Sequence, residues 1–203
     1  MAINAAPTKS NLIKAKNSLE FSKKGFELLD KKRTVLIKEM MSLIDKAKEV
    51  QDRVSITFKE AYRALEFVNI TLGVNNVEEI SLSIPKEEEF DILLKSVMGV
   101  EIPKVIYEKE KLDPQYGFFR TNPVLDTAIA KFTEVKYLIY ELAEIENSVF
   151  KLAMEIEKTQ KRANALEKIQ IPKYTTQIKF IQEVLEEKER EDFFRLKRVK
   201  SKK

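Results

Sequence analysis

Apolar residues recur every three or four positions through the first third of the chain, and this spacing limits what the chain can fold into. From Leu12 to Val54, eleven of the thirteen positions in this register are apolar. The register passes through Leu12, Ala15, Leu19, Ser22, Phe26, Leu29, Arg33, Leu36, Met40, Leu43, Ala47, Val50 and Val54, and Ala61, Ala64 and Val68 extend it. Such a spacing places these side chains on one helical stripe, so a long coiled-coil helix is predicted.

A second register of the same kind occupies the last part of the chain, again with eleven apolar residues in thirteen positions. It runs through Val124, Ala128, Lys131, Val135, Leu138, Leu142, Ile145, Val149, Leu152, Ile156, Thr159, Ala163 and Leu166. Near Pro172 the register slips by one residue, to Ile171, Tyr174, Ile178, Ile181 and Leu185. Because proline removes one backbone donor, we expect a kink there but no helix end.

Neither helix can bury its stripe alone, so the simplest fold pairs them antiparallel in one coiled coil. With 34% charged and 43% hydrophobic residues, the composition fits narrow apolar seams. The fold class predicted is all-α dominated, with two long antiparallel helices and a short β-hairpin and loop insert. We expect helical segments at 1–70 and 124–203, an insert at 71–123, and the two termini together at one end.

The insert holds three of the four glycines and four of the six prolines. Alternation of Ile80, Leu82 and Ile84 with serines predicts a short strand. Residues 90–96 and 100–106 predict a hairpin that turns near Gly99, with Pro103 on an unpaired strand edge. The three glutamates at 87–89 are interpreted as a solvated loop, because consecutive carboxylates face different directions.

Several function classes are disfavoured by what the chain lacks. It has no His, Cys or Trp, no glycine-rich phosphate loop and no metal-ligand spacing, so we expect neither an enzyme nor a bound cofactor or metal. No signal peptide or stretch of about 18 apolar residues is recognisable, so a soluble cytoplasmic protein is expected.

The last nine residues carry six positive charges and no acid. Such a tail can bind phosphates, and a cytoplasmic coiled-coil adaptor that binds nucleic acid through it is the alternative function. The competing interpretation is a solvated helix end, where cations are stabilised by the helix dipole. Phe193 and Phe194 are adjacent and cannot both enter one seam, so at least one should be exposed or meet a partner.

Four segments of the sequence are distinctive: PTKSNLIKAKNSLEFSKKGFELLDKKRTVL at 7–36, MGVEIP at 98–103, KRANALEKIQIP at 161–172, and the segment from LEEKERED at 185–192 to Lys200. In these segments the sequence resembles the D subunit of the V-type and A-type rotary ATPases. This resemblance implies a central rotor shaft without an active site of its own. The implied partners are the catalytic and regulatory subunits of the ATPase ring, a small companion stalk subunit and the socket subunit of the membrane ring.

The resemblance also implies which residues meet those partners, with no nucleic acid involved and contact with the membrane only through the complex. The interface with the catalytic ring is predicted at Lys23, Lys24, Lys31, Lys32, Arg33, Arg195, Lys197, Arg198 and Lys200. The interface with the stalk or socket subunits is predicted at Met98, Gly99, Val100 and Pro103. The expected location is cytoplasmic, peripheral to the membrane as part of the complex.

Overall fold

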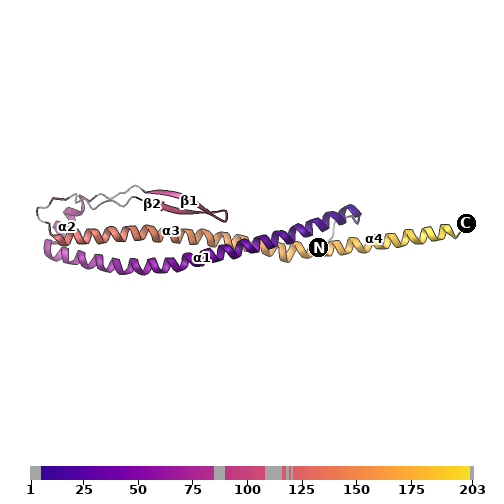
Figure 1. Cartoon of the computed structure of the whole chain (residues 1–203), viewed down its shortest axis with the longest axis horizontal. Helices are drawn as coiled ribbons and strands as arrows, with labels where there is room; N and C mark the ends of the chain where they lie inside the picture. Colours follow the sequence, from indigo (N-terminus) through magenta and orange to yellow (C-terminus); the bar gives the residue numbers. More distant parts are fainter. Residues whose placement is uncertain (1–5, 85–89, 108–115, 118, 120, 202–203) are drawn as a thin grey trace. The chain divides into compact units, whose positions relative to one another are not determined.

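The computed structural model of the protein describes residues 6–84, 90–107, 116–117, 119 and 121–201. Its elements in chain order are α1 (Lys9–Leu72), α2 (Val74–Ser81), β1 (Asp91–Val97), β2 (Val100–Ile106), α3 (Pro123–Ala165), the π-helical turn η1 (Leu166–Gln170) and α4 (Ile171–Lys200) (Figure 1). The chain forms two compact units, one from Met1–Val35 with Ile156–Lys203 and the other from Leu36–Glu155.

In the first unit, α1 pairs with the end of α3, η1 and α4. Its start is capped by Thr8, whose hydroxyl accepts a hydrogen bond from the backbone N–H of Asn11 at 3.2 Å. The Nζ atom of Lys9 lies 3.1 Å from Glu189, while Arg33 donates a hydrogen bond to Gln160. Partner numbers fall as residue numbers in α1 rise, so the helices are antiparallel.

The second unit repeats this arrangement with the rest of α1 and α3. Lys131 lies 2.9 Å from Glu60, and near the far end of α1 the buried residues Val68, Leu125 and Ala128 form one apolar cluster. The predicted fold class is therefore confirmed: the protein is mainly helical, with a long antiparallel helix pair and a two-stranded hairpin in the middle.

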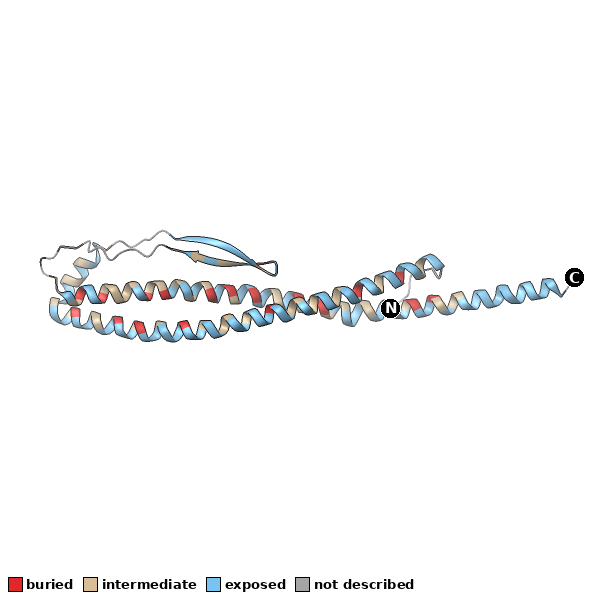
Figure 2. Cartoon of the chain, in the orientation of Figure 1, coloured by how far each residue is buried: buried red, intermediate tan, exposed pale blue. Residues whose placement is uncertain are grey.

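Burial follows the predicted registers closely. Figure 2 shows buried positions recurring along the helices. The buried residues that belong to the two registers are Ala15, Ser22, Leu36, Val50, Ala61, Val68, Ala128, Val135, Leu138, Ile145, Leu152, Thr159, Ala163, Ile178 and Ile181. Burial of one large aliphatic side chain contributes about 1.5–3 kcal/mol, so stability is spread along the seams.

The slip of register before α4 has a structural cause in η1. There the N–H of Ile171 donates to the carbonyl of Leu166, five residues back. A π-helical turn holds one more residue than an α-helical turn, which accounts for a slip of one residue. Pro172 follows inside the first turn of α4 and the backbone stays helical, so the chain continues without a helix end, as expected.

The strand expected at 80–84 is wrong. Residues 74–81 form α2, which follows a break at Gly73, where φ is +79°. Val77 and Ile80 pack against the cluster around Val68, and their spacing of three residues suits one face of a helix. The glutamates at 87–89 lie outside the described residues.

The predicted hairpin is confirmed. Val97 pairs with Val100 across a two-residue turn, and Leu94 pairs with Pro103. Met98 and Gly99 have φ values of +51° and +80°, as a type I′ turn requires. Counting from the turn, Leu94 and Pro103 form a pair without mutual hydrogen bonds, so the proline nitrogen faces the outer edge of β2, as expected.

Candidate functional site

The β-hairpin lies beside α3 and is attached to it by a small cluster of aromatic rings (Figure 1). Phe90 precedes β1 and Tyr107 follows β2, so both carry the base of the hairpin. The ring of Tyr107 stacks on Tyr137 at 4.9 Å and lies 5.6 Å from Tyr140, while Phe90 lies 5.7 Å from Tyr140. Contacts of this geometry fix the base of the hairpin on the helix.

Glu144 adds a directional contact to the same face of α3. Its carboxylate Oε2 accepts a hydrogen bond from the backbone N–H of Val105 at 2.9 Å. Tyr137, Tyr140 and Glu144 follow a 3-4 spacing, so they form a second stripe beside the seam. The sequence prediction missed these three residues, although that spacing and the aromatic rings in the insert were available as signals.

The two strands of the hairpin differ in exposure. On β2, Ile102, Pro103 and Val105 are half-buried. On β1, the side chains of Ile92, Leu93 and Leu94 are 57%, 55% and 59% exposed. β1 thus presents three consecutive exposed large apolar side chains, which alternate between the two faces of the hairpin.

The predicted interface residues in the hairpin lie together at its turn and along β2. Met98 is 49% exposed and Gly99 is at the tip, whereas Val100 is only 9% exposed and Pro103 is half-buried. Met98 and Gly99 are therefore the most accessible members of this set, and Val100 is a buried one.

Some of the predicted basic residues of α1 already form ion pairs with acids of the same helix. Lys24 is paired with Glu20 at 2.7 Å, and this hydrogen bond lowers the pKa of the Glu20 carboxyl. Arg33 binds Asp30 at 2.6 Å, and only 31% of its side chain is exposed. Lys23 and Lys31 are exposed, and Lys32 is half-buried.

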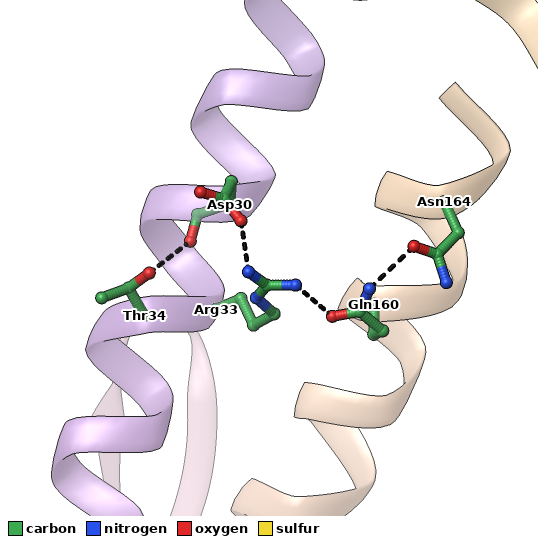
Figure 3. A network of polar contacts seen from close by, with 5 residues as sticks. All are labelled: Asp30, Arg33, Thr34, Gln160 and Asn164. Carbon is green, nitrogen blue, oxygen red and sulfur yellow. Dashed lines mark hydrogen bonds and ion pairs between the residues drawn. The ribbon is translucent and has the colours of Figure 1, made fainter. Parts of the chain in front are cut away.

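Figure 3 shows that Arg33 is the centre of a polar network between α1 and α3. Its guanidinium donates to the side-chain carbonyl of Gln160, whose amide donates to Asn164 at 2.7 Å. The buried Nε atom of Arg33 has no hydrogen-bond partner among the described residues. Arg33 therefore lies in the helix interface, in a layer of polar side chains, with less than a third of its side chain exposed.

The C-terminal basic residues lie on the part of α4 that extends beyond the start of α1. Lys197, Arg198 and Lys200 are exposed in its last turn, and Arg195 lies 3.7 Å from Glu191. Their apolar neighbours are exposed too, since the side chains of Phe193, Phe194, Leu196 and Val199 are each about two-thirds exposed. The expectation that at least one of the two phenylalanines is exposed is confirmed.

The two basic sets do not lie together, and neither do the two helix ends. Lys9 is level with Glu189, Lys23 is 14 residues further into the pair, and Arg195 is six residues beyond it. At about 1.5 Å per residue, Lys23 and Arg195 are roughly 30 Å apart along the axis. The termini share a unit, but α4 extends past the start of α1, so the expected common tip is corrected to a single overhanging helix.

Near the connection of the insert to α3, Tyr116 donates a hydrogen bond to the carboxylate of Asp126. Burial and this contact raise the pKa of Tyr116 to about 12. Burial also raises the pKa of Tyr107 in the aromatic cluster. Both hydroxyls are therefore neutral well above physiological pH, and neither is suited to act as a base.

Within the described ranges, no three Asp or Glu side chains are grouped so as to hold a metal ion. The same part of the chain includes no helix with an apolar stretch long enough to cross a bilayer. What the structure does present is a pair of long helices with three features: a β-hairpin attached to α3, an overhanging helix end, and a polar layer in the seam.

Comparisons with known proteins show to which family the chain belongs. The sequence profile of the ATP synthase D subunit family matches residues 11–201. The D subunit of the V-type ATP synthase of Thermotoga neapolitana is 44% identical over 200 residues, covering 98% of both chains. The D subunit of the A-type ATP synthase of Thermococcus sibiricus is 38% identical over 202 residues, covering 98% of this chain and 94% of that protein.

The chain therefore belongs to the ATP synthase D subunit family of V-type and A-type rotary ATPases, and the resemblance seen in the sequence is confirmed. It is a central stalk subunit with a structural role, not a catalytic one. Its partners are other subunits of such a complex. The alternative of a nucleic-acid-binding adaptor has no support from these comparisons.

Proposed function

We propose that this stalk subunit is the rotor shaft of its complex. In this proposal the overhanging end of α4 contacts the catalytic and regulatory subunits of the ring, and the β-hairpin contacts the companion stalk subunit or the socket subunit of the membrane ring. The observation that carries the proposal is the exposure of these two regions, since both present large apolar side chains to solvent.

The mechanism follows from geometry alone. A helix end without threefold symmetry, placed inside a ring of alternating subunits, presents a different face to each catalytic interface. Each angular position of the shaft therefore favours one pattern of nucleotide occupancy, and a change of occupancy favours another angle. ATP hydrolysis or synthesis in the ring is in this way coupled to rotation of the membrane ring and to ion transport.

The ring contact combines apolar and charged parts of α4. Phe193, Phe194 and Leu196 supply contact area, and Arg195, Lys197, Arg198 and Lys200 supply charge. Exposed ion pairs contribute only about 0–1 kcal/mol each and are screened by salt. We therefore expect many small contacts that share the load, with Lys23 and Lys31 on α1 as separate, more distant contributors.

The ring contact is tested in the reconstituted complex by changing Arg195, Lys197, Arg198 and Lys200 together to Ala. We expect slower coupled ATP hydrolysis, with a larger loss at low salt than at high salt and unchanged helical content. The matched control changes Lys38, Lys46, Lys48 and Lys59 to Ala, because these exposed lysines of α1 carry the same total charge. Normal turnover of the first variant at low salt would contradict the ring contact.

The hairpin contact is tested by changing Leu93 and Leu94 to Asp, since both side chains are more than half exposed. We expect weaker binding of the companion or socket subunit and a changed rate of coupled hydrolysis, with little change in thermal stability of the isolated chain. Deletion of residues 90–106 should have the same effect in stronger form. If both variants assemble and hydrolyse ATP normally, the hairpin is only a connector between helices.

A further inference from the structure

The outward-facing backbone groups of the two hairpin strands differ in whether the rest of the unit covers them. Val97 and Val100 close the turn, so hydrogen-bonded pairs alternate with open pairs away from it. The backbone nitrogens of Glu101, Pro103 and Val105 therefore point away from β1. Pro103 has no N–H, and the N–H of Val105 donates to Glu144. The outer edge of β2 is thus largely protected against pairing.

Among the described residues, neither a proline nor a hydrogen bond to a side chain outside the hairpin protects the outer edge of β1 in this way. Ile92, Leu94 and Ser96 belong to the open pairs, so their backbone N–H and C=O groups point to the outer edge. β1 contains no proline, and its side chains from Asp91 to Ser96 are exposed. A partner can therefore reach the hairpin through β1, provided that the hairpin keeps one orientation on α3.

Two kinds of contact hold that orientation, and they differ in direction dependence. The aromatic contacts of Tyr107, Tyr137, Tyr140 and Phe90 fix the base of the hairpin through several ring arrangements, from stacked to tilted. The hydrogen bond from Val105 to Glu144 lies two residues nearer the turn and links backbone to a half-buried carboxylate. Hydrogen bonds to ionised groups are short and depend strongly on angle.

We infer that Glu144 is a positioning residue that fixes β2 along α3 and so determines which way β1 and the turn face. Two contacts separated along the strand define a direction, and the burial of Val100 near the turn adds packing that is less dependent on angle. The effect on partner binding rests on the proposed function of the hairpin. The attachment itself does not.

The attachment is tested first in the isolated full-length chain by hydrogen exchange of the Val105 amide. Glu144→Ala should speed its exchange about tenfold or more, because the N–H loses its acceptor. Glu144→Gln retains an acceptor oxygen and should restore much of the protection. The amide of Ile102, which is paired within the hairpin, serves as an internal reference.

Glu146→Ala is the matched control, since Glu146 is an exposed acid on the same helix and its loss changes charge and helix propensity equally. It should leave the Val105 amide as protected as in the wild type. Equal protection of Val105 in wild type and Glu144→Ala would overturn the inference. So would a loss of protection as large in Glu146→Ala.

The second test measures binding of the companion and socket subunits and the coupled hydrolysis rate in the reconstituted complex. Glu144→Ala should weaken binding several-fold and Glu144→Gln should recover it, which a purely helical role of the residue would not produce. If exchange responds as expected but binding does not, positioning by Glu144 has no role in assembly. If neither hairpin variant of the proposed function affects binding, the proposed contact fails while the attachment stands.

Discussion

The helical seams and the β-hairpin are stabilised in opposite ways. The seams bury many aliphatic side chains along the helices, so their contribution to the free energy of unfolding is spread over many positions. The hairpin leaves the apolar side chains of Ile92, Leu93 and Leu94 exposed, and it is attached through four rings and one carboxylate. The seams therefore supply most of the stability, and the hairpin, in the function proposed for it, supplies a contact surface at small cost in stability.

The largest effect should come from comparing two leucines of equal size in these regions. Leu152 in the seam is fully buried, whereas Leu93 on β1 is 55% exposed. Leu152→Ala should lower the free energy of unfolding by about 2–5 kcal/mol and Leu93→Ala by about 0.5 kcal/mol or less. Urea unfolding followed by circular dichroism measures both. Losses of similar size would abolish the distinction between seam and hairpin.

A second effect is expected where the insert joins α3. Folding raises the pKa of Tyr116 to about 12, above the ordinary value near 10. The neutral hydroxyl is therefore favoured in the folded state, and its contribution is complete below pH 10 and is lost as the pH rises toward 12. Tyr116→Phe should cost about 1 kcal/mol at about pH 8, because it removes a hydrogen bond to a carboxylate at a partly exposed site.

The difference in unfolding free energy between wild type and Tyr116→Phe should shrink as the pH rises from about 10 to about 12. Absorbance of tyrosinate should show one group fewer titrating late in the variant. A difference that stays constant over this interval would mean that the hydroxyl has no stabilising contact with Asp126.

A smaller effect is expected at the turn of the hairpin. Met98 has φ of +51°, which is unfavourable for most side chains but tolerated by Asn. Met98→Asn should stabilise the hairpin by about 0.5–1 kcal/mol, seen as slower amide exchange at Val97 and Val100. Unfolding of the helices should not change, since the turn is far from the seam in sequence. Faster exchange at both amides would show that Met98 stabilises the turn through its side chain.

The smallest effect should come from the ion pair of Lys9 with Glu189. Both side chains are more than 60% exposed, so the pair is screened by solvent. A double-mutant cycle with Lys9→Ala and Glu189→Ala should give a coupling of about 0.3 kcal/mol or less at physiological salt. A coupling of about 1 kcal/mol or more would mean that charge pairs contribute to the seam as well as burial does.

The sequence was informative where one period dominates. The 3-4 registers predict the helices and most buried positions, and the slip near Pro172 is visible in the sequence, although its cause in η1 is not. The strand expected at 80–84 failed because Ile80 and Ile84 fit an alternating pattern, while Val77 and Ile80 fit a helical one. Packing against the cluster of Val68, Leu125 and Ala128 favours the helix. Two members of that cluster are more than forty residues away in the sequence, so local periodicity does not reveal the contact.

Features set by pairing between distant segments were not predictable in the same way. Glu144 is one of 33 acidic residues, and only the position of Val105 on the outer edge of β2 distinguishes it. The predicted closeness of the two basic sets failed because it depends on which residue of α4 lies level with the start of α1. Periodicity gives the face of a helix but not its offset along a partner.

The extra residue in η1 has an angular consequence for α4. One residue corresponds to about 100° of helical rotation, so its insertion turns every later side chain by that amount relative to the end of α3. The rotation brings Ile178 and Ile181 to buried positions. It also sets the angular position of Phe193 and Arg195 around the axis of α4, more than twenty residues away. The direction in which side chains of the overhanging end point around the helix axis is therefore set by the helical phase of the five residues Leu166–Gln170, far from that end in the sequence.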